Sequence, residues 1–193
     1  AGDTAGDVDL TAEGTLDWMH LGLTGWMPAQ KATSASLISA VKPVVAKEAQ
    51  STYSNNPTTF SWTDGKSTRS VQSSATGVYT ACIGCGMSAN ITIPGASKGM
   101  VIVQVYLGLY KSAGKFTAAL EGGAAYTDAS LHANRGTTNG IYTLRIPVAV
   151  DPAILSSGAA AGPGTDRTLT VTWTQTAGAN VNFASITVGE QAQ

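Results

Sequence analysis

The sequence predicts an all-β fold, an antiparallel β-sandwich or jelly roll, and three observations support this prediction. About nine to eleven short runs of alternating or β-branched residues follow one another, separated by turn signals. No stretch shows the strand–helix–strand rhythm of a parallel sheet. Charged residues make up only 12% of the 193 residues, which is typical of secreted bacterial β-proteins. We expect residues 1–7 to form a flexible N-terminal segment and residues 8–193 to form a single domain.

The first elements are short. Val8, Leu10 and Ala12 alternate with polar residues, which predicts a first strand. Residues 29–50 contain apolar residues at helical spacings, but Pro43 lies among them and would end or kink a helix. Leu37-Ile38 and Val44-Val45 can instead lie on two short strands, and their Ser, Thr and Val neighbours favour strands.

The β pattern is stronger after residue 57. Residues 100–110 form the clearest strand, and because both of its faces are rather apolar we expect it to be central in its sheet. Lys111–Lys115 is predicted to be a hairpin loop before a return strand, and residues 156–164 to be a surface loop. Further strands are expected at 58–62, 77–81, 89–93, 142–146, 169–173 and 181–187, with a turn at 63–66.

Several motifs occur in a characteristic order: VDLTAEGTLDWMHLG, YSNNPTTFSWTDG, TGVYTACIGCGMSANITIPG, IVQVYLGLYKSAGKFTAAL, GIYTLRI, TLTVTW and NVNFASITV. This order resembles that of bacterial secreted modules with a galactose-binding-like β-sandwich, which carry D-W-x-H-W-G and F-S-W-x-D-G signatures. In this chain Leu21 stands where the family usually has a second Trp. The resemblance implies a non-catalytic jelly roll, often an accessory module beside glycan-degrading or adhesive domains.

The stretch GTLDWMHLG places Asp17, Trp18 and His20 within four residues, in a chain with two histidines. A metal site needs three or four ligands, and His132 is distant in the sequence. The alternative is structural: Asp17 caps a turn and His20 is a hydrogen-bonded, partly buried strand residue. We favour the structural interpretation, with Trp18 as a core anchor.

Cys82 and Cys85 are separated by Ile83-Gly84, which could form a tight turn. A catalytic C-x-x-C would sit at a helix start beside a parallel sheet, and this pair lies between predicted strands. One such pair is at most half of a zinc site. We therefore predict a local structural disulfide between Cys82 and Cys85, with modest stabilisation because its loop is small.

Aromatic residues divide into core and loop candidates. Trp18, Trp62 and Trp173 lie in regular alternating runs and are predicted to be core residues. Sugar recognition uses flat aromatic faces together with polar groups for hydroxyls. The predicted ligand-binding residues are those in loop-like contexts: Trp26, Tyr53, Asn55, Tyr126 and Asp128.

Composition limits the partners. Net charge is −1 and no Lys/Arg cluster is present, which argues against nucleic acid, and no apolar run approaches the ~20 residues of a membrane helix. The chain opens with Ala and small residues, as after removal of a signal peptide, so we expect a secreted or cell-surface location. No cofactor is required. Calcium is an alternative, with Asp3, Asp7, Asp9, Asp64 and Asp128 as scattered oxygen ligands.

The sequence is compatible with three functions. The favoured one is a non-catalytic binding module that recognises a glycan or cell-surface polymer. The second is a structural or adhesive surface protein that self-associates, since low charge weakly disfavours a monodisperse monomer. An enzyme is least favoured, because no acid pair, nucleophile–base motif or cofactor fingerprint is visible in the sequence.

Overall fold

The computed structural model describes residues 6–33, 35–46, 49–97, 99–148 and 164–192, and it confirms the all-β prediction. Its single helix in these residues is α1 (Leu10–Glu13). The strands are β1 Gly6–Asp9, β2 Asp17–Gly22, β3 Gly25–Gln30, β4 Lys42–Pro43, β5 Gln50–Tyr53, β6 Thr58–Trp62, β7 Val71–Ser74, β8 Gly77–Thr80, β9 Gly86–Ile93, β10 Gly99–Leu120, β11 Tyr126–Asp128, β12 Thr137–Pro147 and β13 Arg167–Ala192. No helix in the described residues is long and apolar enough to cross a membrane.

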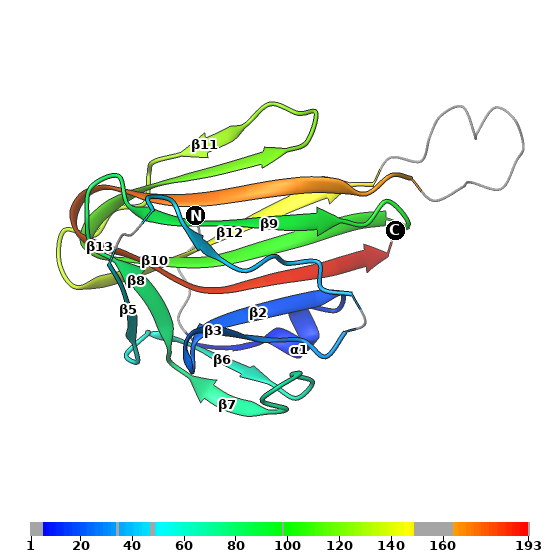
Figure 1. Cartoon of the computed structure of the whole chain (residues 1–193), viewed down its shortest axis with the longest axis horizontal. Helices are drawn as coiled ribbons and strands as arrows, with labels where there is room; N and C mark the ends of the chain where they lie inside the picture. The colour runs from blue at the N-terminus through cyan, green and yellow to red at the C-terminus, as the bar shows by residue number, and fades with distance from the viewer. Residues whose placement is uncertain (1–5, 34, 47–48, 98, 149–163, 193) are drawn as a thin grey trace, which may run out of the picture.

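Two long antiparallel strands, β10 and β13, organise the larger, ten-stranded sheet (Figure 1). The first half of β10 pairs with β12 and the second half pairs with β11. In the same way β13 pairs first with β9 and then with β8 and β2. Because buried side chains from both halves of these strands belong to one hydrophobic core, the sheet folds over on itself as a sandwich.

The hairpin predicted at Lys111–Lys115 is wrong, because β10 continues through this segment. The pairing shifts register between Ala113 and Gly114, and Lys111 has a φ of 46° opposite the bend at Gly178, whose φ is 87°. Glycine and small polar residues mark such irregularities as readily as they mark hairpin turns. For the same reason the two strands predicted at 169–173 and 181–187 are parts of one strand, β13.

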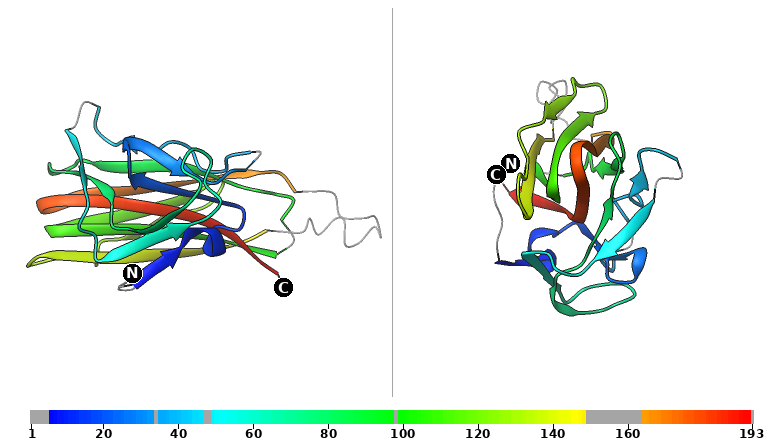
Figure 2. Two further views of the ribbon diagram at one scale, coloured as in Figure 1. Left: turned by 90° about the horizontal axis from the view of Figure 1, so that it is seen from below. Right: turned by 90° about the vertical axis from the view of Figure 1, so that its left-hand side faces the viewer.

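A second, three-stranded sheet of β1, β6 and β7 lies with α1 against the outer face of the sandwich (Figure 2). A separate apolar cluster joins the two parts, formed by Leu10, Trp18, Ala29, Phe60, Trp62, Tyr106 and Ala184. Trp18 and Trp62 have ring centroids 5.1 Å apart, and both are buried as predicted. The third predicted core tryptophan, Trp173, is also buried, in the main core.

The N-terminal prediction needs correction. Only Gly6–Asp9 is a strand, and it pairs in parallel with β6. Leu10 and Ala12 lie in α1, where the Asp9 carboxylate accepts the backbone N–H groups of Thr11 and Ala12 and so caps the helix. Residues 1–5 lie outside the described residues, so a flexible N-terminal segment stays a prediction, as does the division into one domain.

The segment that joins β3 to β5 forms no helix in its described residues, in agreement with the preference for strands. The strand predicted at Val44-Val45 is wrong, because these residues lie in a bend and the strand is β4, just before them. Ile38 forms a bridge to Ile91, and the two-residue β4 pairs with β9. Residue 34, residues 47–48 and nearly all of the predicted loop at 156–164 lie outside the described residues.

Candidate functional site

The hydrogen bonds of the Asp17 carboxylate are all made within the protein. It is buried and accepts the backbone N–H groups of Trp18, Leu37 and Ile38 at 2.8, 2.7 and 3.1 Å. Burial raises the pKa of Asp17, and these hydrogen bonds partly oppose that rise. Asp17 therefore anchors the segment after β3 to β2, in agreement with the structural interpretation.

His20 is equally enclosed. Its ring is fully buried between Phe60 and Trp62, with centroids 5.0 and 5.3 Å away. Its Nε2 atom hydrogen-bonds to the hydroxyl groups of Ser74 and Thr76 at 3.1 and 2.9 Å. Burial lowers the pKa of His20 to about 3, so the ring is neutral at physiological pH. This arrangement holds β2 against the three-stranded sheet of β1, β6 and β7 (the small sheet) and leaves no open face of the ring for a ligand.

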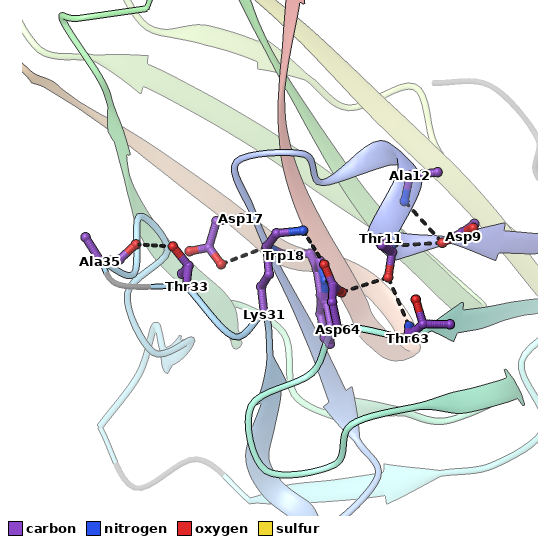
Figure 3. Close-up of polar contacts among 10 residues, drawn as sticks. All are labelled: Asp9, Thr11, Ala12, Asp17, Trp18, Lys31, Thr33, Ala35, Thr63 and Asp64. Carbon is purple, nitrogen blue, oxygen red and sulfur yellow. Dashed lines mark hydrogen bonds and ion pairs between the residues drawn. The ribbon is translucent and has the colours of Figure 1, made fainter.

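Asp64, one of the calcium candidates, lies at the centre of a hydrogen-bonded cluster (Figure 3). Its carboxylate accepts from the Thr11 hydroxyl at 2.7 Å, the Trp18 indole N–H at 2.8 Å and the Lys31 ammonium at 2.5 Å. Burial raises the pKa of Asp64, but these hydrogen bonds and the Lys31 charge outweigh it, so the pKa lies below its ordinary value. The carboxylate therefore links β2, α1 and Lys31, the residue that follows β3.

The other described calcium candidates are also engaged. Asp7 accepts from the hydroxyls of Thr59 and Ser61, and Asp128 accepts from the Ser130 backbone and the Tyr142 hydroxyl. Asp3 lies outside the described residues. Within the part of the chain that the structure describes, no group of three or more His, Cys, Asp or Glu residues could hold a metal ion.

A different set of polar residues converges on the outer face of the sandwich, and we call it the tyrosine–asparagine pocket. Its volume is about 200 Å³, and its lining consists of Tyr53, Asn55, Tyr79, Tyr110, Thr137, Asn180 and Asn182. Strand register explains the convergence. Tyr110 is paired with both Thr137 and Asn180, and Asn182 is paired with Tyr79. Since paired residues share a face and alternate residues return to it, these side chains point the same way.

The floor of the pocket is a fixed amide. Asn182 is buried, and its Oδ1 accepts from the Tyr53 hydroxyl at 3.1 Å. The same hydroxyl accepts from Asn56 Nδ2 at 3.1 Å, and Asn56 in turn accepts from Asn139. The Tyr53 hydroxyl thus makes both of its hydrogen bonds within the protein and positions Asn182. Burial raises the pKa of the Tyr53 phenol. Among the described residues Asn182 Nδ2 has no hydrogen-bond partner, so it presents a donor to the pocket.

Two glycines make room for this floor. A Cβ atom at Gly108 would lie 2.4 Å from Asn182 Oδ1 and 2.8 Å from Asn139 Oδ1. At Gly77 a Cβ atom would lie 2.5 Å from the Tyr53 ring, so this ring rests directly on the backbone of β8. Any larger residue at these positions would displace the groups that shape the pocket.

The rim is more open than the floor. Tyr110 is 41% exposed, Tyr79 and Asn180 are half-buried, and Asn55 and Thr137 are exposed. The Lys111 ammonium lies 5.1 Å from the centre of the Tyr110 ring, in a cation–π contact. The pocket therefore offers aromatic rings, amides and hydroxyls on one solvent-accessible surface.

The structure separates the predicted ligand-binding residues. Tyr53 and Asn55 line the tyrosine–asparagine pocket, although Tyr53 lies on β5 and not on a loop. Trp26 also lies on a strand, β3, where it is half-buried and packs against the main core, and it does not line this pocket. The residues missed by the sequence analysis are Tyr79, Tyr110, Thr137, Asn180 and Asn182. Their signal was weak, because each lies alone in a strand pattern and only pairing unites them.

Tyr126 belongs to a second hollow, the lateral groove, of about 720 Å³. It lies beside β11 and β12, and its lining is mainly apolar: Ala118, Leu120, Ala124, Tyr126, Ile141, Tyr142, Thr143, Leu144, Arg145, Ile146 and Leu169. Tyr142 is stacked on Phe116 with centroids 3.9 Å apart and donates to Asp128 at 3.0 Å. Tyr126 and Asp128 therefore do not complete the site that contains Tyr53 and Asn55.

The two cysteine sulfurs lie at disulfide-bonding distance, with Cα atoms 5.2 Å apart. The turn between them is anchored to β13, because Gln175 exchanges backbone hydrogen bonds with Gly84 and Cys85 at 2.9 and 2.8 Å. This pairing fits a structural disulfide that secures the end of the sheet near the bend of β13.

No protein-family model matches the chain, and no curated protein matches it. Solved structures with a similar arrangement include carbohydrate-binding modules. TmCBM61, solved with β-1,4-galactotriose, is 14% identical, with 79% of this chain and 90% of that chain covered and a TM-score of 0.41. A family 35 carbohydrate-binding module from an environmental isolate is 18% identical, with 56% and 72% covered and a TM-score of 0.35.

Other similar structures are not carbohydrate-binding modules. A cyclase from Fischerella sp. TAU, in complex with an indolyl butanone, is 9% identical, with 84% of this chain and 93% of that chain covered and a TM-score of 0.45. The enzymatically active domain of tailspike protein 4 of bacteriophage CBA120 is 12% identical, with 81% of this chain covered and a TM-score of 0.42; the chain spans only 20% of that protein's length. At these identities and TM-scores none of the likenesses assigns a function.

Proposed function

We propose that this chain is a non-catalytic, secreted glycan-binding module and that the tyrosine–asparagine pocket is its ligand site. The observation that carries the proposal is the convergence of Tyr79, Tyr110 and the amides of Asn180 and Asn182 on one accessible face. Aromatic rings pack against the C–H faces of sugars, and amides donate to and accept from their hydroxyls. The chemistry of this lining matches a polyhydroxylated ligand.

The charge of the lining also supports binding over catalysis. None of the seven lining side chains is a carboxylate, an imidazole or a thiol. General acid–base catalysis most often uses one of the first two groups, with a pKa adjusted to the reaction. The strongly perturbed histidine of this chain, His20, is enclosed under the small sheet instead.

Two exposed tyrosines give a matched test. Tyr110 is 41% exposed in the pocket and Tyr126 is 52% exposed in the lateral groove, so alanine at either position should leave the core intact. Affinity electrophoresis against a series of polysaccharides identifies a retained polymer, and calorimetry then measures its affinity. We expect Tyr110→Ala to weaken binding at least about tenfold, equivalent to ~1.4 kcal/mol, and Tyr126→Ala to leave it unchanged.

The proposal would be abandoned if no polysaccharide retards the protein, or if Tyr126→Ala and not Tyr110→Ala removes binding. Self-association and adhesion at a cell surface stay predictions. Light scattering during size-exclusion chromatography, at rising protein concentration, tests them independently of the pocket.

A further inference from the structure

The shape of the tyrosine–asparagine pocket narrows the ligand. The pocket has a buried floor at Asn182 and an exposed rim at Tyr110, Thr137 and Asn55. Its volume is about 200 Å³. Sites for drug-sized ligands begin at about 300 Å³, so this space is on the scale of one sugar ring with its hydroxyls and not of an oligosaccharide.

Two sides of the pocket are closed by protein. Along the strands toward the small sheet, Asn56, Thr58 and Asn139 are buried and joined by hydrogen bonds, so nothing can pass beneath that sheet. Across the strands the Tyr53 ring, which rests on the backbone of Gly77, closes the β5 side. The rim residues Tyr110, Thr137 and Asn180 leave access from solvent. Binding to the interior of a glycan chain needs an open path on both sides of the site, and the closed sides restrict such a path.

Every lining side chain is uncharged, and the neighbouring Lys111 ammonium is held over the Tyr110 ring. Burying a carboxylate on such a surface without an ionic partner is costly. From the volume, the closed sides and the uncharged lining, we infer that the pocket holds a single, uncharged terminal sugar unit of a glycan and does not bind the interior of a chain. This inference rests on the proposed function of the pocket.

The test compares polysaccharide samples that have the same composition but different numbers of chain ends. The polysaccharide retained in affinity electrophoresis is divided, and one part is partially hydrolysed to shorter chains of the same composition. Both parts then compete, at equal mass, for the protein on an immobilised sample of the intact polymer. Terminal recognition predicts that inhibition per gram rises in proportion to the number of chain ends. Unchanged or weaker inhibition per gram would overturn the inference while leaving glycan binding established.

A second experiment uses monosaccharide probes. Calorimetry with methyl glycosides of neutral hexoses, pentoses and deoxyhexoses should find one sugar that binds within about threefold of its oligosaccharide, a difference under ~0.7 kcal/mol. The corresponding uronic acid should bind at least about tenfold more weakly. Affinity that increases steadily with oligosaccharide length, or equal binding of the uronic acid, would contradict a pocket for one uncharged unit.

Substitution of Gly108 tests the pocket floor. A Cβ at this position would collide with Asn182 and Asn139 and displace the pocket floor without changing the chemical identity of any lining residue, so Gly108→Ala should abolish binding of the methyl glycoside. Tyr126→Ala is the control and should bind normally. Circular dichroism and thermal unfolding establish that Gly108→Ala is folded; a folded variant with unchanged affinity would refute the proposed floor. If instead no polysaccharide is retained at the outset, the proposed function itself fails.

Discussion

Two polar regions lie on the same outer face of the sandwich, and one is covered by the three-stranded sheet whereas the other is open to solvent. Under the small sheet, Trp18, His20 and Asp64 form the covered cluster, whose polar groups are almost all paired within the protein. Farther along β13, where that sheet does not reach, Asn182 lines the open pocket and its Oδ1 accepts from the Tyr53 hydroxyl. The comparison teaches that residue type alone does not mark a site. What distinguishes the two regions is whether a second layer supplies partners for the polar groups.

The largest expected effect concerns the covered cluster and pH. Folded His20 has a pKa of about 3, whereas the unfolded residue takes up a proton below its ordinary pKa of 6.5. Stability should therefore fall as pH falls through this window, by about 0.7 kcal/mol from pH 7 to 6 and about 1.2 kcal/mol from pH 6 to 5, approaching about 1.4 kcal/mol per pH unit at lower pH. Urea unfolding at pH 7, 6 and 5 measures the slope. The raised pKa values of Glu13 and Asp17 partly offset this loss of stability at lower pH, because the folded protein binds protons at these carboxylates more readily than the unfolded chain does.

The two histidines provide the control for this slope. His20→Gln should be less stable but should lose the dependence on pH between 7 and 5. His132→Asn changes an exposed residue and should retain it. If His20→Gln kept the full slope, another group would be responsible for it.

The second prediction separates stability from binding. Asp64→Ala leaves the indole N–H of the fully buried Trp18 without its acceptor, at a cost of about 2 kcal/mol. Asp64→Asn retains an acceptor oxygen and loses mainly the ion pair with Lys31, so it should cost under about 1 kcal/mol. Neither variant should change the affinity for a glycan, and a change in affinity would show that the covered cluster and the pocket are coupled.

The smallest effect is expected at the boundary between the regions. Tyr53→Phe removes one hydrogen bond to Asn182 and one from Asn56, and should cost about 1 kcal/mol in unfolding free energy. Glycan affinity should also fall several-fold, because the Asn182 amide is no longer fixed. For stability, Tyr79→Phe is the matched control, since the Tyr79 hydroxyl has no partner among the described residues; it is no control for affinity, because Tyr79 lines the pocket. Equal stability of the two variants would contradict the positioning role of Tyr53.

Local patterns predicted the sandwich well because alternation reports which side of a strand is buried. Trp18, Trp62 and Trp173 were assignable to the core on that basis, and the structural roles of Asp17 and His20 followed from the lack of ligand partners nearby. The bend in β10 was not predictable, because the residues that bend a paired strand also form hairpin turns.

Only two of the seven residues that line the pocket could be predicted from the sequence. Tyr53 and Asn55 were found because they occur together in a polar segment. Tyr110, Asn180 and Thr137 come from three strands that are distant in sequence, and only the register of those strands brings them together. The loop context predicted for Trp26 is wrong, since its Gly and Pro neighbours suggested a loop although it lies on β3.

The pairing of β13 has a mechanical consequence. From Asn182 to its last residues, β13 is bonded to β10 along one edge and, over parts of this length, to β8 and β2 along the other. Tension between a ligand held at Asn182 and the far end of β13 would act parallel to the strand. Such a load is shared among many backbone hydrogen bonds at once, whereas peeling would break them singly. The strand that supplies the pocket floor is thus oriented to resist being pulled from its sheet.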